Sequence, residues 1–338
     1  MKLRSELIRQ FIIEQVGEHP NDLANLVAQE FAISRQAANR HIKILVEDGI
    51  LESSGTTRSR SYSLKVIRKR FAFPLKEFRE EDVVWREYVA PNIVGIKENV
   101  YGILQYAFTE MFNNVIDHSG GTEALVVLES NPAKISITVI DDGVGIFEKI
   151  RAFKGLRDHR EAILELSKGG LTTDSKNHSG QGIFFTSRML DEFIILADGL
   201  FYIRNAEKDD WLIETSPDPS GGTFVKMSIA TNSTRTTREV FDRFADVDYG
   251  FKKTHVPLKL AKYGEELLVS RSQAKRVLDR FDRFDEVLLD FKGVDSVGQA
   301  FADEIFRVYR RSHPDTRIIA IHTSDQIEKM IKRAQSED

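Results

Sequence analysis

Apolar residues recur three and four positions apart in the N-terminal part of the chain, and this spacing predicts three short helices. The first ends before Pro20, and Asn21 or Asp22 can cap the second. Ser34 can cap the third, which we expect over residues 35–48. The apolar positions of these helices are Leu3, Leu7, Ile8, Phe11, Ile12, Leu23, Leu26, Val27, Phe31, Ala37, Ala38, Ile42, Leu45 and Val46.

Two short strand-like runs follow the third helix, at 50–53 and 61–66, and the polar, basic loop SSGTTRSR joins them. Together with the helices they form a first predicted domain at 1–70. Residues 71–94 contain two prolines and mixed charge, so we expect a connector there.

The rest of the chain mixes helices and strands. A segment at 95–232 begins with a helix, continues with strand-like runs at 124–128 and 135–140, and has a glycine-rich stretch that ends at Gly182. The last segment, 245–338, alternates strands and helices, which indicates a small α/β domain. Its strand-like runs are 286–291 and 317–322, and its helix-like runs are 273–281 and 299–310. The pattern therefore predicts an α+β multidomain protein.

The composition excludes several classes of protein. With no cysteine among 338 residues, a disulfide scaffold, a thiolate zinc site and a cysteine nucleophile are ruled out. The absence of cysteine fits a reducing cytosol, and we expect a cytoplasmic protein. Charges run through the N-terminal helix, and nowhere do about 18 apolar residues follow one another, so we expect neither a signal peptide nor a membrane span.

The net charge of -4 is unevenly distributed. Residues 34–70 hold nine Lys and Arg against three Asp and Glu, a balance of +6. A basic patch joined to an acidic body is typical of a nucleic-acid-binding domain fused to another module.

The string AISRQAANRHIKILVEDGILESSGTTRSRSYSL resembles the recognition helix and wing of bacterial winged helix-turn-helix regulators. The resemblance implies binding to duplex DNA, and a homodimer, because such domains usually bind paired half-sites. A solvated basic face or a winged helix used for protein interaction are the alternatives. The residues expected to contact bases or phosphates are Arg35, Gln36, Asn39, Arg40 and Lys43 from the helix and Arg58 and Arg60 from the wing.

The run FTEMFNNVIDHS places Glu110, Asn114, Asp117 and His118 at helical spacing, which predicts that they share one face. A carboxylate beside a carboxamide suits metal-assisted phosphate chemistry, because the carboxylate can accept a proton and the amide oxygen can bind Mg²⁺. For this helix alone, a buried polar face is the alternative.

Three glycine-containing motifs follow this helix: DDGVG at 141–145, GQG at 180–182 and GGT at 221–223. Closely spaced glycines let the backbone approach a nucleotide, and amides at the start of a helix point at phosphate oxygens. Each motif alone is a weak signal, but the four elements in this order indicate a nucleotide site.

The set resembles the GHKL family, the ATP-binding domain with a Bergerat-type α/β sandwich that gyrases and histidine kinases share. The resemblance implies ATP and Mg²⁺ as cofactors, with Glu110 as general base, Asn114 as the Mg²⁺ ligand, and residues 147–179 as a mobile lid. Asp117 belongs to the same implied binding set, and Lys176 and His178 could reach the γ-phosphate. Asp141 would bind the adenine amino group near Gly143, Gly145 and Thr223, and Gly180 and Gly182 would contact phosphates.

Two departures from the family pattern bear on function. Gly182 is followed by Ile183, Phe184 and Phe185 where the family has Leu-Gly-Leu, so we expect unusual packing at the end of the lid. The helix before Glu110 has no histidine, which argues against a conventional histidine kinase. Three hypotheses stay open: an ATP-switched DNA-binding regulator with slow hydrolysis, a serine/threonine protein kinase of the anti-sigma type acting on a partner protein, and a binding module with a vestigial pocket.

The strings VLLDFKGVDSVGQAFADEIFRVYRR and RIIAIHTS resemble a STAS-like domain, the fold of anti-sigma-factor antagonists, over about residues 250–335. Gln299 occupies the place expected for the phosphorylated serine of that fold, and we expect Ser296 to be a helix cap. The domain is therefore predicted to bind a protein partner or to mediate dimerisation.

Overall fold

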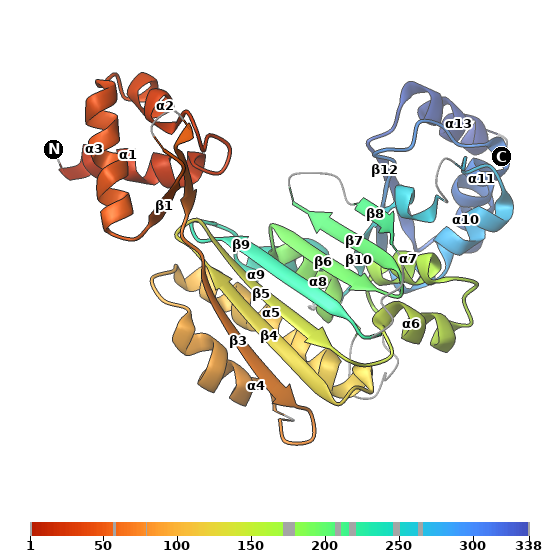
Figure 1. Ribbon diagram of the computed structural model, residues 1–338. Coiled ribbons are helices and arrows are strands. Elements are labelled where there is room, and N and C mark those ends of the chain that lie inside the picture. The colour runs from red at the N-terminus through yellow and green to blue at the C-terminus, as the bar shows by residue number, and fades with distance from the viewer. Residues whose placement is uncertain are drawn as a thin grey trace.

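The N-terminal domain of the computed structural model contains three helices and a β-hairpin in the described part of the chain, as predicted (Figure 1). The elements are α1 (Lys2–Gln15), α2 (Leu23–Glu30), α3 (Arg35–Glu47), β1 (Leu51–Ser54) and β2 (Ser61–Leu64). Strands β1 and β2 pair antiparallel. The structure describes residues 2–56, 59–78, 80–171, 180–206, 211–215, 221–245, 251–262 and 266–336.

The two caps expected at the helix starts differ. Ser34 caps α3, since its Oγ accepts a hydrogen bond from the Ala37 amide at 3.1 Å. Asp22 stands at the start of α2, but its carboxylate lies 3.2 Å from Nδ1 of His19 instead of bonding to the helix. The domain has its own core, and Leu3 and Leu7 lie outside it with 78% and 57% of their surface exposed. The core residues are Ile8, Ile12, Val16, Leu23, Val27, Ala38, Ile42, Leu45 and Leu51.

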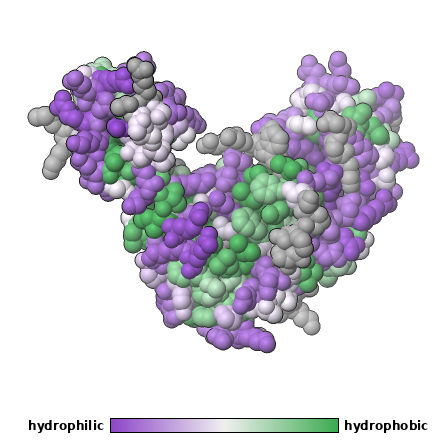
Figure 2. Space-filling view, in the orientation of Figure 1, coloured by the Kyte–Doolittle hydropathy of each residue, from purple (hydrophilic) through white to green (hydrophobic). Residues whose placement is uncertain are grey.

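The central domain is built on an antiparallel sheet with strand order β3-β4-β5-β9-β6-β7-β8. One face of the sheet is covered by helices, and the other is turned to the viewer in Figures 1 and 2, where hydrophobic and hydrophilic residues lie side by side. The strands are β3 (Ile67–Pro74), β4 (Glu123–Ser130), β5 (Lys134–Asp141), β6 (Glu192–Ala197), β7 (Leu200–Asn205), β8 (Trp211–Glu214) and β9 (Phe224–Ala230).

Residues 71–94, expected as a connector, belong to the central domain. Strand β3 runs from the hairpin of the first domain into this sheet and pairs along its whole length with β4, from Ile67 opposite Ser130 to Pro74 opposite Glu123. The short helix α4 (Glu81–Val84) and the π-helical turn Trp85–Val89 follow. Trp85 and Val89 are buried, so this segment is part of the core.

Helices α5 (Glu98–Asn114), α8 (Gly182–Met189) and α9 (Thr237–Phe244) lie behind the sheet, and α6 (Ile146–Lys154) and α7 (His159–Lys168) lie at the end nearest the C-terminal domain (Figure 1). No helix in the described part of the chain has both the length and the apolar composition needed to cross a bilayer.

The C-terminal domain has a parallel sheet in the order β10-β11-β12, which gives the small α/β architecture predicted. It lies at the opposite end of the central domain from the N-terminal domain (Figure 1). Its strands are β10 (Lys253–Pro257), β11 (Glu286–Asp290) and β12 (Arg317–Ile321), and its helices are α10 (Arg271–Leu278), α11 (Gln299–Asp303), the π-helical turn Glu304–Tyr309, α12 (Arg310–Ser312) and α13 (Asp325–Ser336).

Candidate functional site

A cavity of about 270 Å³ opens in the central domain between α5, α6, α7, α8 and the sheet. It collects residues that are up to 115 positions apart in the sequence, from Glu110 to Val225. The residues selected from the sequence that line it are Glu110, Asn114, His118, Asp141, Gly145, Gly180, Gly182 and Thr223.

Glu110 and Gly182 both line the cavity and lie in direct contact with each other. A Cβ atom added to Gly182 would stand 2.0 Å from Oε2 of Glu110, so only glycine leaves room for this carboxylate at the start of α8. One turn before Glu110, partial burial of Tyr106 raises the pKa of its phenol, and the charge and hydrogen bond of Glu110 raise it further. Tyr106 therefore stays protonated and can donate to the carboxylate.

Three of the four residues that were expected to share one helix face do line the cavity together. Glu110, Asn114 and His118 line the cavity, whereas Asp117 is exposed and lies outside it. The reason is that α5 ends at Asn114 and continues as a π-helical turn over Val115–Ser119, whose wider turn changes the angle between successive side chains.

Asp141 and Asp142 are adjacent but have different roles. Asp141 is 7% exposed, and its Oδ1 accepts hydrogen bonds from the amides of Gly143 at 2.9 Å and Thr223 at 3.3 Å. Burial raises the pKa of Asp141, although these hydrogen bonds oppose the shift. Asp141 lines the cavity, whereas Gly143 is not part of the described lining.

Asp142 points the other way and fixes the backbone before β4. Its carboxylate accepts from the amides of Glu123 and Thr122 at 3.0 and 2.7 Å, and from the Thr122 hydroxyl at 2.6 Å. The hydrogen bonds from Glu123 and Thr122 lower the pKa of Asp142. Asp142 is thus a structural carboxylate, and Asp141 is the one available to a ligand.

Lys149 was not anticipated from the sequence. It lies on α6, lines the cavity, and donates a hydrogen bond to the carbonyl oxygen of His118. Burial lowers the pKa of its ammonium group, and the charge of Asp117 opposes this shift. Its place four residues after Gly145, on a helix that begins at the cavity, is the sequence signal that could have identified it.

The described residues provide a limited set of metal ligands. No group of three or more His, Asp or Glu side chains in the described part of the chain is arranged to hold a metal ion. The Asn114 side chain, which lines the cavity beside Glu110, provides one amide oxygen.

The residues expected to bind DNA form an exposed surface on the N-terminal domain. Lys43 is ion-paired with Glu47 at 3.4 Å. Burial lowers the pKa of the neighbouring His41, and the charges of Arg9 and Arg40 lower it further. Exposed members of the set are Arg35, Gln36, Asn39, Arg40 and Lys43 on α3, and Arg60 next to the hairpin.

Three of the selected residues, Arg58, Lys176 and His178, lie outside the described residues.

In the C-terminal domain, the predicted cap is wrong. Gly298, and not Ser296, is the residue at the start of α11. Gln299 is exposed at the first position of this helix. The segment that contains Val269 lies very close to Gly298. A Cβ atom on Gly298 would meet Cα of Val269 at 2.7 Å, which explains why glycine occupies the position.

Comparison with known proteins bears on the C-terminal domain. A family model described as STAS-like domain of unknown function (DUF4325) matches residues 273–328. This match supports the STAS-like part of the predicted fold. No curated protein matches the chain.

Proposed function

We propose that this protein is a DNA-binding regulator whose central GHKL-type domain binds Mg-ATP and switches assembly or affinity for DNA. The observation that carries the proposal is the cavity, where Glu110, Asn114, Asp141 and Thr223 meet although they come from distant parts of the chain. Active-site hypotheses rest best on a concave pocket with a few convergent polar groups of perturbed pKa, and this cavity has both.

The cavity suits an adenine nucleotide at both ends. Asp141 receives its backbone hydrogen bonds on Oδ1, so we expect Oδ2 to accept from the adenine amino group. Met111, Ile150 and Val225 provide apolar walls for a ring. At the other end, the backbone at the start of α8 offers amides to phosphate oxygens, and Lys149 adds a positive charge.

The residues around Glu110 suit phosphate chemistry. Asn114 would hold Mg²⁺, which neutralises charge on the phosphate oxygens when it is bound. Glu110 can take a proton from a water or a hydroxyl group, and Tyr106 orients its carboxylate. Transfer to a hydroxyl group would make the protein a serine/threonine kinase of the anti-sigma type, which is the alternative function.

The two outer domains provide the partners in this proposal. The exposed face of α3 would bind duplex DNA, with a second copy of the chain on the other half-site. The STAS-like domain would bind a protein partner, which is the usual role of such domains. Changes in nucleotide occupancy would then be transmitted to both.

A nucleotide titration of three proteins tests the proposal: the native chain, Glu110→Gln, and Glu98→Gln as a control on the exposed first turn of the same helix. We expect all three to bind Mg-ATP in calorimetry. Turnover should fall about 10²-fold or more in Glu110→Gln and stay unchanged in Glu98→Gln, since general-base catalysis contributes this much. With labelled ATP, phosphate on a partner protein would favour the kinase, and no binding by the native chain would contradict the proposal.

A further inference from the structure

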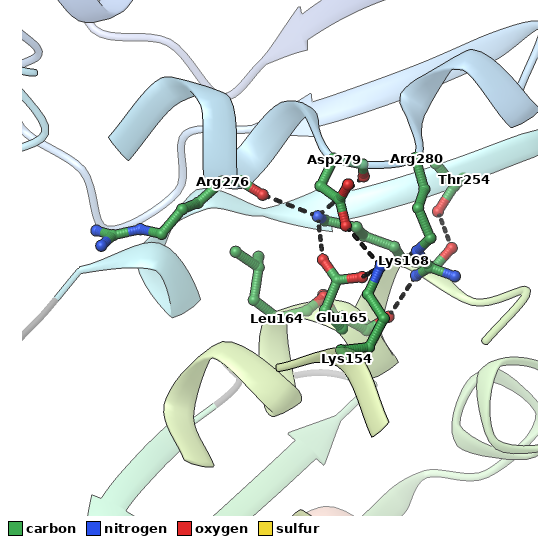
Figure 3. Close-up of polar contacts among 9 residues, drawn as sticks. Lys154, Leu164, Glu165, Lys168, Thr254, Arg276, Asp279 and Arg280 are labelled. Carbon is green, nitrogen blue, oxygen red and sulfur yellow. Dashed lines mark hydrogen bonds and ion pairs between the residues drawn. The ribbon is translucent and has the colours of Figure 1, made fainter. Parts of the chain in front are cut away.

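Helix α7 faces both the cavity and the C-terminal domain. Leu166 lines the cavity, and its neighbours Glu165 and Lys168 point into the C-terminal domain (Figure 3). A displacement of α7 by the C-terminal domain would therefore move one wall of the candidate nucleotide site.

Glu165 and Lys168 are the centre of a buried charge cluster between the two domains (Figure 3). The side chains of Lys168, Glu165 and Arg280 are 0%, 4% and 7% exposed. Lys168 Nζ donates to Glu165, to the carbonyl of Arg276 at 3.0 Å and to the carbonyl of Asp279 at 3.1 Å. All three protons of the ammonium group thus have acceptors, and two of these acceptors are carbonyls of the C-terminal domain.

Arg280, from the C-terminal domain, forms a second connection to Glu165 of α7. Its Nε donates to Oε2 of Glu165 and its Nη2 to the Glu165 carbonyl, both at 2.9 Å. The backbone of Arg280 has φ of 65°, a left-handed conformation that is unfavourable for a residue with a side chain. The strain is offset by this double contact, which indicates that the geometry of the cluster is closely determined.

A second attachment to the C-terminal domain involves helix α8, which also lines the cavity. Phe184 of α8 lines the cavity and packs edge-on against Phe251, next to β10, with ring centroids 4.7 Å apart. Arg188, also on α8, stacks 3.3 Å over the Phe184 ring and donates to the His255 carbonyl of β10 at 3.1 Å. The phenylalanine pair that departs from the family pattern at 184–185 is therefore part of the interface with the C-terminal domain.

We propose that the C-terminal domain controls nucleotide release, because the Glu165–Lys168–Arg280 cluster holds the α7 wall of the cavity in place. The proposal rests on the proposed nucleotide function of the cavity. A protein that binds the STAS-like domain and loosens this cluster would accelerate nucleotide release, and a bound nucleotide would in turn tighten the cluster, since coupling between two sites is reciprocal.

The test measures dissociation of a fluorescent ATP analogue, with Mg²⁺, from the full chain after mixing with excess ATP. Arg280→Gly removes the clamp and relieves the left-handed backbone, and Glu165→Gln removes one charge with little change of shape. Both should dissociate at least about fivefold faster, the low end of ordinary allosteric coupling. The control Arg307→Ala breaks an ion pair with Asp303 inside the same domain and should dissociate at the native rate.

Amide hydrogen exchange of residues 159–171 without nucleotide provides a second measurement. Exchange should rise in Arg280→Gly and Glu165→Gln and not in Arg307→Ala. Native dissociation rates in both cluster variants would overturn the coupling, whether or not exchange rises. If the native chain binds no nucleotide, the proposed function itself fails; if it binds and the variants behave as the native chain does, only the coupling fails.

Discussion

At the scale of single residues, neighbours of the same type have opposite roles because of what surrounds them. Asp141 is buried at the cavity with its pKa raised by burial, and Asp142 is held by three hydrogen bonds from Thr122 and Glu123 with its pKa lowered. The resemblance of the DDGVG motif to the GHKL pattern predicts that Asp141 binds a ligand. The direction in which each points depends on the turn before β4, which is a tertiary contact.

The contact between Glu110 and Gly182 gives a prediction at this scale. Gly182→Ala would place a Cβ atom 2.0 Å from Oε2 of Glu110, so the carboxylate must move. We expect ATP turnover to fall about 10²-fold, because a shift of about 1 Å in a reacting group has this effect.

The matched control is Gly102→Ala on the same helix as Glu110, where an added Cβ meets no atom within 4 Å. This change should leave turnover intact and stabilise the fold by about 1 kcal/mol, the helix propensity difference between alanine and glycine. Turnover and thermal unfolding measure both effects. Equal turnover in the two variants would show that Glu110 is not the reacting carboxylate.

At the scale of elements, the sequence pattern predicts regular α-helices well. It predicts poorly the positions at which an α-helix changes into another helical form. Helix α3 begins at the capped position and has the apolar face expected, because the cap and the 3.6-residue period are local. The end of α5 has no such signal. Its π-helical turn over Val115–Ser119 leaves Asp117 outside the cavity lining.

The exposed face of α3 gives the second prediction. Arg40→Ala should weaken binding to duplex DNA, and the plot of log affinity against log salt should become shallower by about one unit if Arg40 contacts a phosphate. Arg238→Ala is the control, because this arginine of α9 is 87% exposed and lies in the central domain. Fluorescence anisotropy at several salt concentrations measures both, and an equal loss in the two variants would indicate a non-specific charge effect.

At the scale of the whole molecule, the described residues form two hydrophobic cores. One belongs to the N-terminal domain, and the other runs continuously through the central and C-terminal domains. A side-chain hydrogen bond from Asn232 to Glu14 at 3.2 Å bridges the first domain and the rest. The central and C-terminal domains are expected to unfold together, because their charge cluster and their aromatic contacts lie in a shared core.

Calorimetry of the full chain should therefore show two unfolding transitions. Ile42→Ala removes a side chain that is 1% exposed in the N-terminal core and should destabilise only that unit, by about 2–5 kcal/mol. Phe281→Ala, at a fully buried position of the C-terminal domain, should destabilise only the other unit, by about 3–5 kcal/mol. A single transition lowered by both changes would contradict two independent cores.

The sequence by itself determined the features that depend on local chemistry: the helix period, the Ser34 cap, the hairpin after α3 and the glycine and aspartate motifs. Each follows from the conformational preferences of a few adjacent residues. It also located eight of the twenty residues that line the cavity, because the motif residues lie at the ends of predicted elements.

Only the tertiary structure decided which of these residues meet. It placed Lys149 at the cavity, moved Asp117 out, and made strand β3 an edge of the central sheet rather than a connector. It also buried Glu165, Lys168 and Arg280 between two domains, although each is charged. Charged residues in sequence are expected at the surface, and they become stable in an interior only when distant parts of the chain bring them partners, which no local pattern records.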